Sequence, residues 1–123
     1  NSGEINPGKP IGRLDIKGDY TQDSNGALNI EIAGNERGEF DQINVLGRAN
    51  LGGRLNIKLV NKFKPHNGDK FEIVRYDSSE GEGFTDVSGL AQKRGKFKIA
   101  YGKNNVTLIF THDNKEKEQE SKI

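Results

Sequence analysis

Hydrophobic and polar residues alternate along most of this chain, most clearly between residues 43 and 59. Apolar side chains occupy the odd positions and polar side chains the even ones, with Leu46 as the exception. Gly47 and Gly53 fall in the apolar phase, where a missing side chain lets the backbone bend without changing which residues face inward. The pattern is typical of half-buried β-strands that share one core face. The predicted core positions are Leu14, Ile16, Leu28, Ile30, Ile43, Val45, Leu55, Ile57 and Leu59.

One six-residue phrase occurs three times, at residues 12–17, 26–31 and 53–58. Each copy is a glycine followed by apolar–polar alternation, and a chain that repeats its strand is expected to repeat its architecture. If the copies lie in order on one parallel sheet, their last residues (lysine, glutamate and lysine) form a ladder of alternating charge, which stabilises adjacent strands. The repeats therefore predict stacked parallel strands with the second copy between the other two.

A competing interpretation starts from the two glycines at positions 52 and 53. A Gly-Gly pair between Leu51 and Arg54 is a typical sequence for a tight hairpin. A hairpin there would pair the flanking strands antiparallel and would favour a β-sandwich. The direction of strand pairing separates the two interpretations.

Further strands are predicted at residues 71–73, 97–101 and 106–110, separated by glycine- and asparagine-rich turns. No window has the 3.6-residue spacing of an amphipathic helix. The length of 123 residues fits one domain. We expect a polar N-terminal segment (1–11), a single β domain (12–110) and a charged, disordered tail (111–123).

Composition narrows the function classes. Hydrophobic residues make up only 31% of the chain and charged residues 30%, so the core is thin and suits an elongated shape. The net charge of +1 gives no basic footprint for nucleic acid. Cysteine is absent, which excludes disulfides and thiolate metal sites. Because no apolar run reaches the ~18–20 residues of a membrane helix, we expect no direct membrane insertion.

Glycine corners, alternating strands and aromatic positions follow one another in a distinctive order at residues 12–22, 26–32, 40–55, 63–71, 83–84, 101 and 106–108. This order resembles the C-terminal end of bacterial autotransporter passenger domains, including the segment often called autochaperone, and the similar modules of large bacterial surface proteins. The resemblance implies an all-β fold: the end of a right-handed parallel β-helix (a solenoid) with an antiparallel capping hairpin, for which residues 97–110 are the candidate. It also implies an extracellular or bacterial cell-surface location.

The function implied by this resemblance is a non-catalytic structural module that caps and stabilises a longer β-solenoid of a secreted or surface adhesin-like protein. Its partners would be the neighbouring solenoid repeats and, through an open sheet edge, other copies of the chain. The alternative is a β-sandwich module that binds carbohydrate or a protein partner. We do not expect an enzyme, because no convergent acid, base and nucleophile stand out.

Two groups of residues are weak candidates for ligand binding. Hard oxygen ligands around a glycine-rich loop are suited to Ca²⁺, although their spacing matches no known calcium loop, and no other cofactor is expected. Aromatic rings are suited to a sugar platform, although an aromatic residue at a strand start or corner more often belongs to the core. The calcium candidates are Asp77, Glu80, Glu82 and Asp86, and the ligand candidates are Tyr20, Tyr76 and Tyr101.

Two further polar features have structural interpretations. Asp41 precedes a predicted strand, and we expect its side chain to close the corner at residues 38–40 rather than to bind a ligand. Four asparagines recur at outward positions, where they either form an amide ladder or keep an exposed face soluble, and the second is favoured. They are Asn29, Asn44, Asn50 and Asn56.

Overall fold

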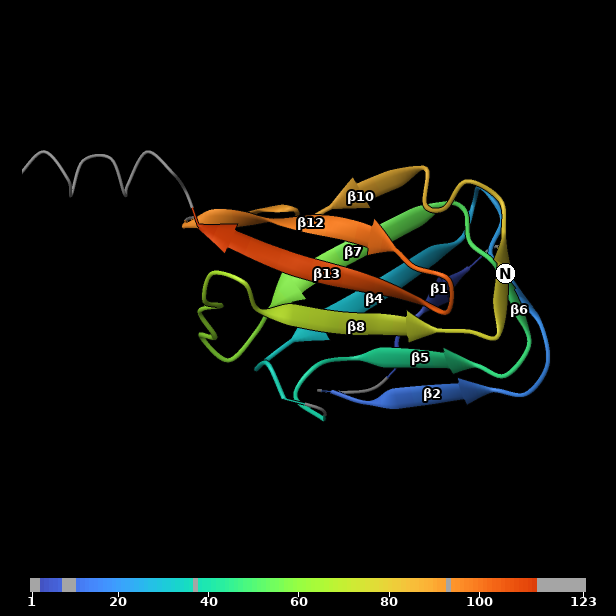
Figure 1. Cartoon of the computed structure of the whole chain (residues 1–123), viewed down its shortest axis with the longest axis horizontal. Coiled ribbons are helices and arrows are strands. Elements are labelled where there is room, and N and C mark those ends of the chain that lie inside the picture. The colour runs from blue at the N-terminus through green and yellow to red at the C-terminus, as the bar shows by residue number, and fades with distance from the viewer. Residues whose placement is uncertain (1–2, 8–10, 37, 93, 113–123) are drawn as a thin grey trace, which may run out of the picture.

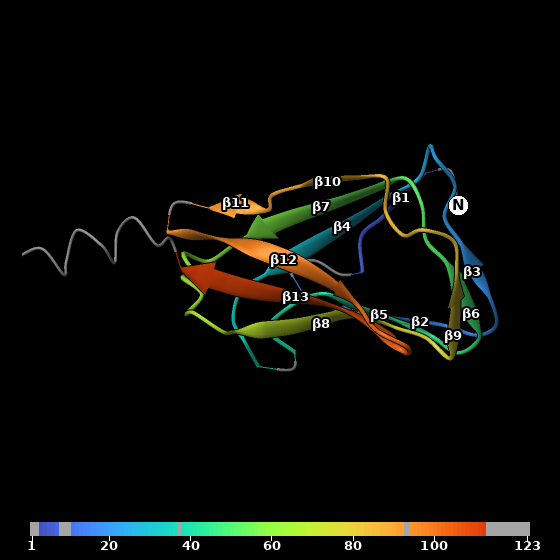
Figure 2. The same ribbon diagram turned by 45° about the horizontal axis from the view of Figure 1, so that its top comes forward.

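The computed structural model describes residues 3–7, 11–36, 38–92 and 94–112. These residues form thirteen strands in three sheets and no helix, which confirms the all-β prediction. The two larger sheets face one another, and the smallest sheet lies across one end of both (Figure 1). Figure 2 shows the larger sheets from a second side, with the small sheet joining them.

The four-stranded and three-stranded sheets are entirely parallel. The four-stranded sheet contains, in order, β1 (Glu4–Ile5), β4 (Ala27–Ile32), β7 (Arg54–Leu59) and β10 (Asp86–Ser88). The three-stranded sheet contains β3 (Tyr20–Thr21), β6 (Arg48–Asn50) and β9 (Ser78–Glu80).

The six-stranded sheet is mixed. Its parallel part contains β2 (Arg13–Ile16), β5 (Gln42–Val45) and β8 (Lys70–Arg75). Its antiparallel part continues from β8 through β13 (Asn105–His112) and β12 (Gly95–Tyr101) to β11 (Ala91–Gln92). The predicted closing hairpin is therefore confirmed as β12 paired with β13.

The chain visits the three sheets in a fixed order. It passes through the four-stranded, six-stranded and three-stranded sheets in β1, β2 and β3, and repeats this order in β4 to β6 and in β7 to β9. We call one such pass a circuit. Each strand pairs in parallel with the strand at the same place in the next circuit.

The core lies between the sheets and follows the predicted alternation. Parallel register places side chains of similar kind in rows across the circuits, such as Ile5, Leu28, Leu55 and Val87. Of the nine predicted core positions, six are buried and three are partly buried against the core. The buried ones are Leu28, Ile30, Ile43, Val45, Leu55 and Ile57, and the partly buried ones are Leu14, Ile16 and Leu59.

The repeated phrase does not occupy one sheet, so that part of the prediction is wrong. The second and third copies form β4 and β7, which pair in parallel with Glu31 opposite Lys58 as expected. The first copy forms β2, which lies in the six-stranded sheet and pairs with β5. The reason is circuit length: the second and third copies are 27 residues apart, with Ala27 opposite Arg54, whereas Arg13 is paired with Gln42. The interval between the first and second copies is shorter than one circuit, so the two copies lie in different sheets.

The prediction of a tight hairpin at Gly52 and Gly53 is also wrong. β6 and β7, which flank the two glycines, belong to different sheets, so the chain turns a corner there. Gly53 has a φ of 64°, and a Cβ at this position would collide with the carbonyl oxygen of Gly26 in the corner of the preceding circuit. Glycine is therefore required by both the backbone conformation and the close approach of two corners.

The ends of the described chain differ from the expected domain boundaries. Glu4–Ile5, within the predicted polar N-terminal segment, forms β1 and pairs with β4. The last strand extends to His112, two residues beyond the predicted end of the β domain. The rest of the predicted tail, residues 113–123, lies outside the described residues.

Candidate functional site

At the end of the circuits nearest the C-terminus, the β12–β13 hairpin extends the six-stranded sheet and contributes side chains to the core. Phe97, Leu108 and Phe110 are buried, with exposed fractions of 2% or less. The ring centroids of Phe97 and Phe110 are 5.3 Å apart, and that of Phe97 is 5.8 Å from Phe71 on β8. Such edge-to-face ring contacts add to the stabilisation from burial. The hairpin therefore covers this end of the core.

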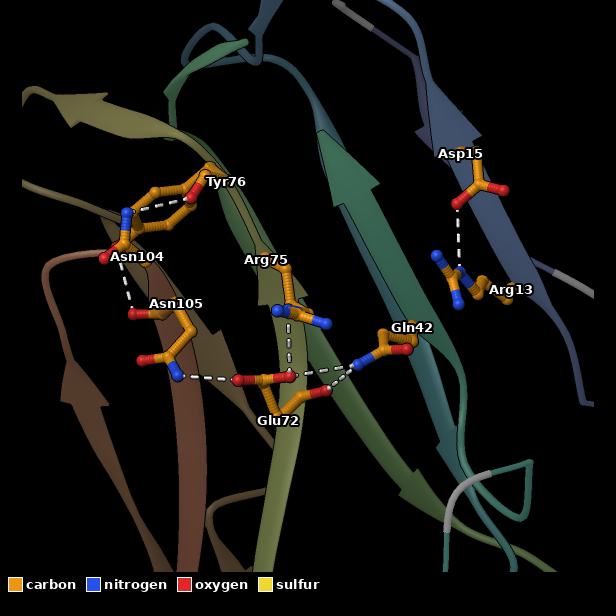
Figure 3. A network of polar contacts seen from close by, with 8 residues as sticks. All are labelled: Arg13, Asp15, Gln42, Glu72, Arg75, Tyr76, Asn104 and Asn105. Atoms are coloured by element: carbon orange, nitrogen blue, oxygen red, sulfur yellow. Dashed lines mark hydrogen bonds and ion pairs between the residues drawn. The ribbon is translucent and has the colours of Figure 1, made fainter. Parts of the chain in front are cut away.

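Polar contacts connect the hairpin to the parallel strands (Figure 3). The carboxylate of Glu72 on β8 accepts a hydrogen bond of 2.6 Å from Asn105 on β13 and one of 3.4 Å from Gln42 on β5. Arg75 lies 3.4 Å from the same carboxylate. The hydroxyl of Tyr76 lies 2.9 Å from the backbone carbonyl oxygen of Asn105. Apart from Arg75 and Glu72, these partners are about 30 residues apart, so no local sequence pattern indicates them.

The opposite end is formed by the edge strands β1, β2 and β3. The apolar side chains of β1 and β2 are only half-buried, in contrast to those opposite them one circuit later, whereas Tyr20 on β3 is buried. Ile5 is paired with Leu28, Leu14 with Ile43 and Ile16 with Val45, and these three partners are 0%, 1% and 2% exposed. The second circuit covers β1 and β2 on one side, and no strand among the described residues pairs with their outer edges. This end is therefore the candidate functional site, an open sheet end with apolar side chains at its rim.

An amide ladder crosses the four-stranded sheet. Asn29 donates to the side-chain oxygen of Asn6 (3.0 Å), and Asn56 donates to that of Asn29 (2.7 Å). Ser88 on β10 ends the ladder, because its hydroxyl donates to Asn56 (2.7 Å). The amide ladder is thus the correct interpretation for Asn29 and Asn56, and the favoured interpretation, an exposed face kept soluble by asparagines, is wrong for these two residues.

Asn44 and Asn50 lie on β5 and β6 in the other sheets, outside this ladder. The ladder also has a direction, since every donor belongs to a later circuit than its acceptor. Asn6 accepts at its side-chain oxygen and is the member of the ladder nearest the open end.

Asp41 has a structural role, but at a different corner from the one expected. Its carboxylate is 1% exposed and accepts backbone hydrogen bonds from Gly12 (2.8 Å) and Glu31 (2.9 Å). It therefore joins the start of β2 to β4 instead of closing residues 38–40. Burial raises the pKa of Asp41 above its ordinary value and outweighs the two hydrogen bonds, which act in the opposite direction.

A buried glutamine, which the sequence pattern did not reveal, holds another corner. Gln22 is 2% exposed and accepts a hydrogen bond of 2.7 Å from the hydroxyl of Tyr20. Its amide nitrogen donates to the carbonyl oxygens of Gly52 (2.7 Å) and Arg54 (3.2 Å) in the next circuit. The polar groups of Gln22 are thus satisfied inside the protein, as buried amides require.

The three candidate tyrosines do not form one exposed platform. Tyr20 and Tyr76 are 7% and 6% exposed and belong to the core, whereas Tyr101 is 48% exposed. Tyr101 accepts a hydrogen bond of 3.2 Å from the backbone N–H of Phe84, and its ring lies where a Cβ at Gly83 would be. Only Tyr101 therefore presents an accessible aromatic surface.

A small cavity brings together four of the seven candidate ligand residues. Its volume is about 160 Å³, and Tyr76, Tyr101, Glu80 and Glu82 contribute to its lining. Glu80 is also paired with Arg48 at 3.1 Å. The other two calcium candidates, Asp77 and Asp86, do not line it, and Asp86 lies on β10 near Arg54 (3.9 Å). Within the described ranges, no three acidic or histidine side chains are grouped as a metal site would need.

No protein-family model matches this chain, and no curated protein sequence matches it. Among the described residues there is no helix of sufficient length and hydrophobicity to cross a membrane.

Proposed function

We propose that this chain is the closing segment of a right-handed parallel β-helix. In this proposal it is a non-catalytic extracellular module that caps and stabilises a longer β-solenoid of a cell-surface or secreted adhesin-like protein. Parallel pairing between successive circuits in all three sheets supports the β-helix. The resemblance to passenger domains supports the location and the right-handed sense.

The observation that carries the proposal is the difference between the two ends. One end is covered by the β12–β13 hairpin, with Phe97 and Phe110 in the core. The other end has edge strands and the half-buried side chains of Ile5, Leu14 and Ile16. Edge strands present backbone groups ready to pair with another strand, and repeat proteins need caps at their ends. A segment with one covered and one open end suits the last position of a stack.

The amide ladder supports the same direction of stacking. It ends at Ser88 on β10 and at Asn6 beside the edge strand β1. A further circuit placed before β1 would meet Asn6 as the next member of this ladder. The contact made by Asp41 would not be repeated there, because Gly12, which corresponds to Asp41 in the register of β2 with β5, has no carboxylate.

The proposal is tested by transferring the segment to another protein. The chain is fused behind a parallel β-solenoid of known structure whose own C-terminal cap has been deleted, with the strands kept in register. We expect the fusion to be monodisperse in light scattering and to melt cooperatively above the uncapped solenoid. The matched control is the same fusion carrying Leu108→Asp, which places an unpaired charge in the core beneath the hairpin.

Two results would contradict the capping function. One is a fusion that aggregates to the same extent as the uncapped solenoid. The other is a fusion in which the two parts melt independently, because the open end would then not have joined the preceding circuit. The Leu108→Asp control separates true capping from a general solubilising effect of an added domain.

A second candidate function is carbohydrate binding at the cavity near Tyr101. The exposed ring and the carboxylates of Glu80 and Glu82 are groups that stack on sugar rings and accept hydrogen bonds from hydroxyls. The cavity volume of about 160 Å³ is below the range of ~300–1,000 Å³ for drug-sized ligands, so it would hold part of one sugar ring. Glycan-array binding that is lost in Tyr101→Ala supports this function, and an array with no binding excludes it for the glycans tested.

A further inference from the structure

The outer edge of β2 presents the backbone N–H and C=O groups of particular residues. β2 is an outer strand of the six-stranded sheet and, among the described strands, pairs only with β5. Backbone groups of alternate residues in a paired strand point to the same side. The carbonyls of Gly12 and Ile16 accept hydrogen bonds from the β5 side, at 3.1 and 2.9 Å. The backbone groups of Arg13 and Asp15 therefore point toward the open edge.

The side chains of the same strand carry opposite charges on its outward face. Arg13 and Asp15 form an ion pair of 2.9 Å, and their side chains are 49% and 56% exposed (Figure 3). Leu14, between them, points inward and is half-buried. Residues 13–15 are thus self-complementary. When two copies of this tripeptide pair antiparallel, each arginine lies opposite the aspartate of the other copy.

The registers available to two antiparallel copies of β2 are few. A pairing that keeps Leu14 on the inner face of both copies must have its two-fold axis at a residue, because a shift of one residue reverses the faces. An axis at Arg13 opposes two arginines, and an axis at Asp15 opposes two aspartates, which is destabilising. An axis at Leu14 places Arg13 of each copy opposite Asp15 of the other.

Backbone geometry is consistent with this axis, as it is with every axis at a residue of β2, so the charges decide between these axes. With the axis at Leu14, the facing residues Arg13 and Asp15 are those whose N–H and C=O groups point to the open edge, so they form hydrogen-bonded pairs. An axis at Ile16 would oppose Asp15 to Lys17, which lies beyond the end of β2. The chain turns away there, at the φ of 101° of Gly18.

We propose that β2 is a dimerisation strand: two copies of this chain pair antiparallel through it, about a two-fold axis at Leu14. The dimer is isologous, and it brings together the half-buried apolar side chains at the two open ends. Since exposed ion pairs contribute little energy, the charges select the register and the apolar contact supplies most of the affinity. The proposal rests on the open end described under the proposed function, and a preceding circuit would occupy β2 and exclude the second copy.

The test uses charge variants of the chain in sedimentation velocity or light scattering. Arg13→Asp gives a strand with two aspartates, and Asp15→Arg gives one with two arginines. We expect each variant alone to be monomeric and their equimolar mixture to form a heterodimer. The swapped double variant, Arg13→Asp with Asp15→Arg, keeps the complementarity and is expected to dimerise like the unmodified chain.

Folding of each variant is checked by circular dichroism and thermal melting, and the swapped variant covers the case in which a single variant does not fold. The proposal is overturned if the unmodified chain is monomeric at all concentrations, if the single variants dimerise equally well, or if the mixture stays monomeric. None of these results affects capping, because the fusion that tests capping places a solenoid circuit on β2. Conversely, a fusion protein that shows no capping does not decide the dimer proposal, because dimerisation is measured on the isolated chain.

Discussion

Truncation of Leu55 is the most direct test of the stacked core. Leu55 on β7 is fully buried and lies between Leu28 on one side and Val87 on the other in the four-stranded sheet. Leu55→Ala removes three carbon atoms from a row that is closed on both sides. The surrounding strands are fixed by parallel pairing, so the space is expected to remain as a cavity.

The expected loss follows from this burial. Leu-to-Ala changes at fully buried sites lower the free energy of unfolding by about 3–5 kcal/mol, from lost transfer energy and the cavity left behind. For a chain of 123 residues, an unfolding entropy of about 2.1 cal/mol/K per residue converts this loss to a decrease in Tm of roughly 10–20 °C. The assay is urea denaturation followed by far-ultraviolet circular dichroism, together with a thermal melt.

Leu14→Ala is the matched control, since it is the same change in a half-buried side chain of the edge strand β2. Less apolar area is lost, and no cavity closed on both sides is formed, so we expect about half the cost, roughly 1–2.5 kcal/mol. Both variants are measured in the Arg13→Asp background, in which the chain is expected to be monomeric. Equal losses for the two leucines would refute the difference between a covered circuit and an open one.

Three other substitutions test individual contacts. Asp41→Asn retains one acceptor and places an amide donor against a backbone N–H, so we expect the unfolding free energy at neutral pH to fall by about 1–3 kcal/mol in urea titrations. Because the pKa of Asp41 is raised above 3.8, the folded state binds this proton more tightly than the unfolded state. The unfolding free energy of the unmodified chain should therefore decrease as pH rises from 3.8 through the raised pKa, a decrease that is absent in the asparagine variant; an increase there would contradict the assigned shift. Asn56→Ala breaks two bonds of the amide ladder and should cost about 1–2 kcal/mol in the same titration, whereas Asn44→Ala, outside the ladder, should cost less than half as much. Ile57→Asp places an unpaired charge in the core and is expected to abolish folding, so a melting curve like that of the unmodified chain would disprove its core position.

The candidate sites illustrate what local sequence does not contain. The structural role expected for Asp41 is correct, but its partners are Gly12, which the pairing of β2 with β5 brings to it from the preceding circuit, and Glu31 on β4 of its own circuit. Tyr76 was a candidate for an exposed platform, yet it is buried with its hydroxyl near the turn of the closing hairpin. In both cases the residue type was informative, whereas its surroundings also depended on residues far along the chain, 29 positions from Asp41 to Gly12 and 26 from Tyr76 to Gly102.

The amide ladder is a similar case. Outward asparagines at alternating positions are compatible with either a soluble face or a ladder, and only register distinguishes them. Asn29 and Asn56 are opposite one another because β4 and β7 are one circuit apart. Ser88, which ends the ladder, has no feature in the sequence that singles it out.

Local sequence determined the class of the fold and most of the core, because alternation fixes the face of each residue once a strand forms, whichever strand lies beside it. Tertiary structure decided the assignment of each strand to a sheet, since this depends on how many residues the chain uses between corners. Two copies of the repeated phrase are one circuit apart and pair, whereas the first is displaced to β2 in another sheet. That displacement places Arg13 and Asp15 at an open edge, where they become candidates for recognition.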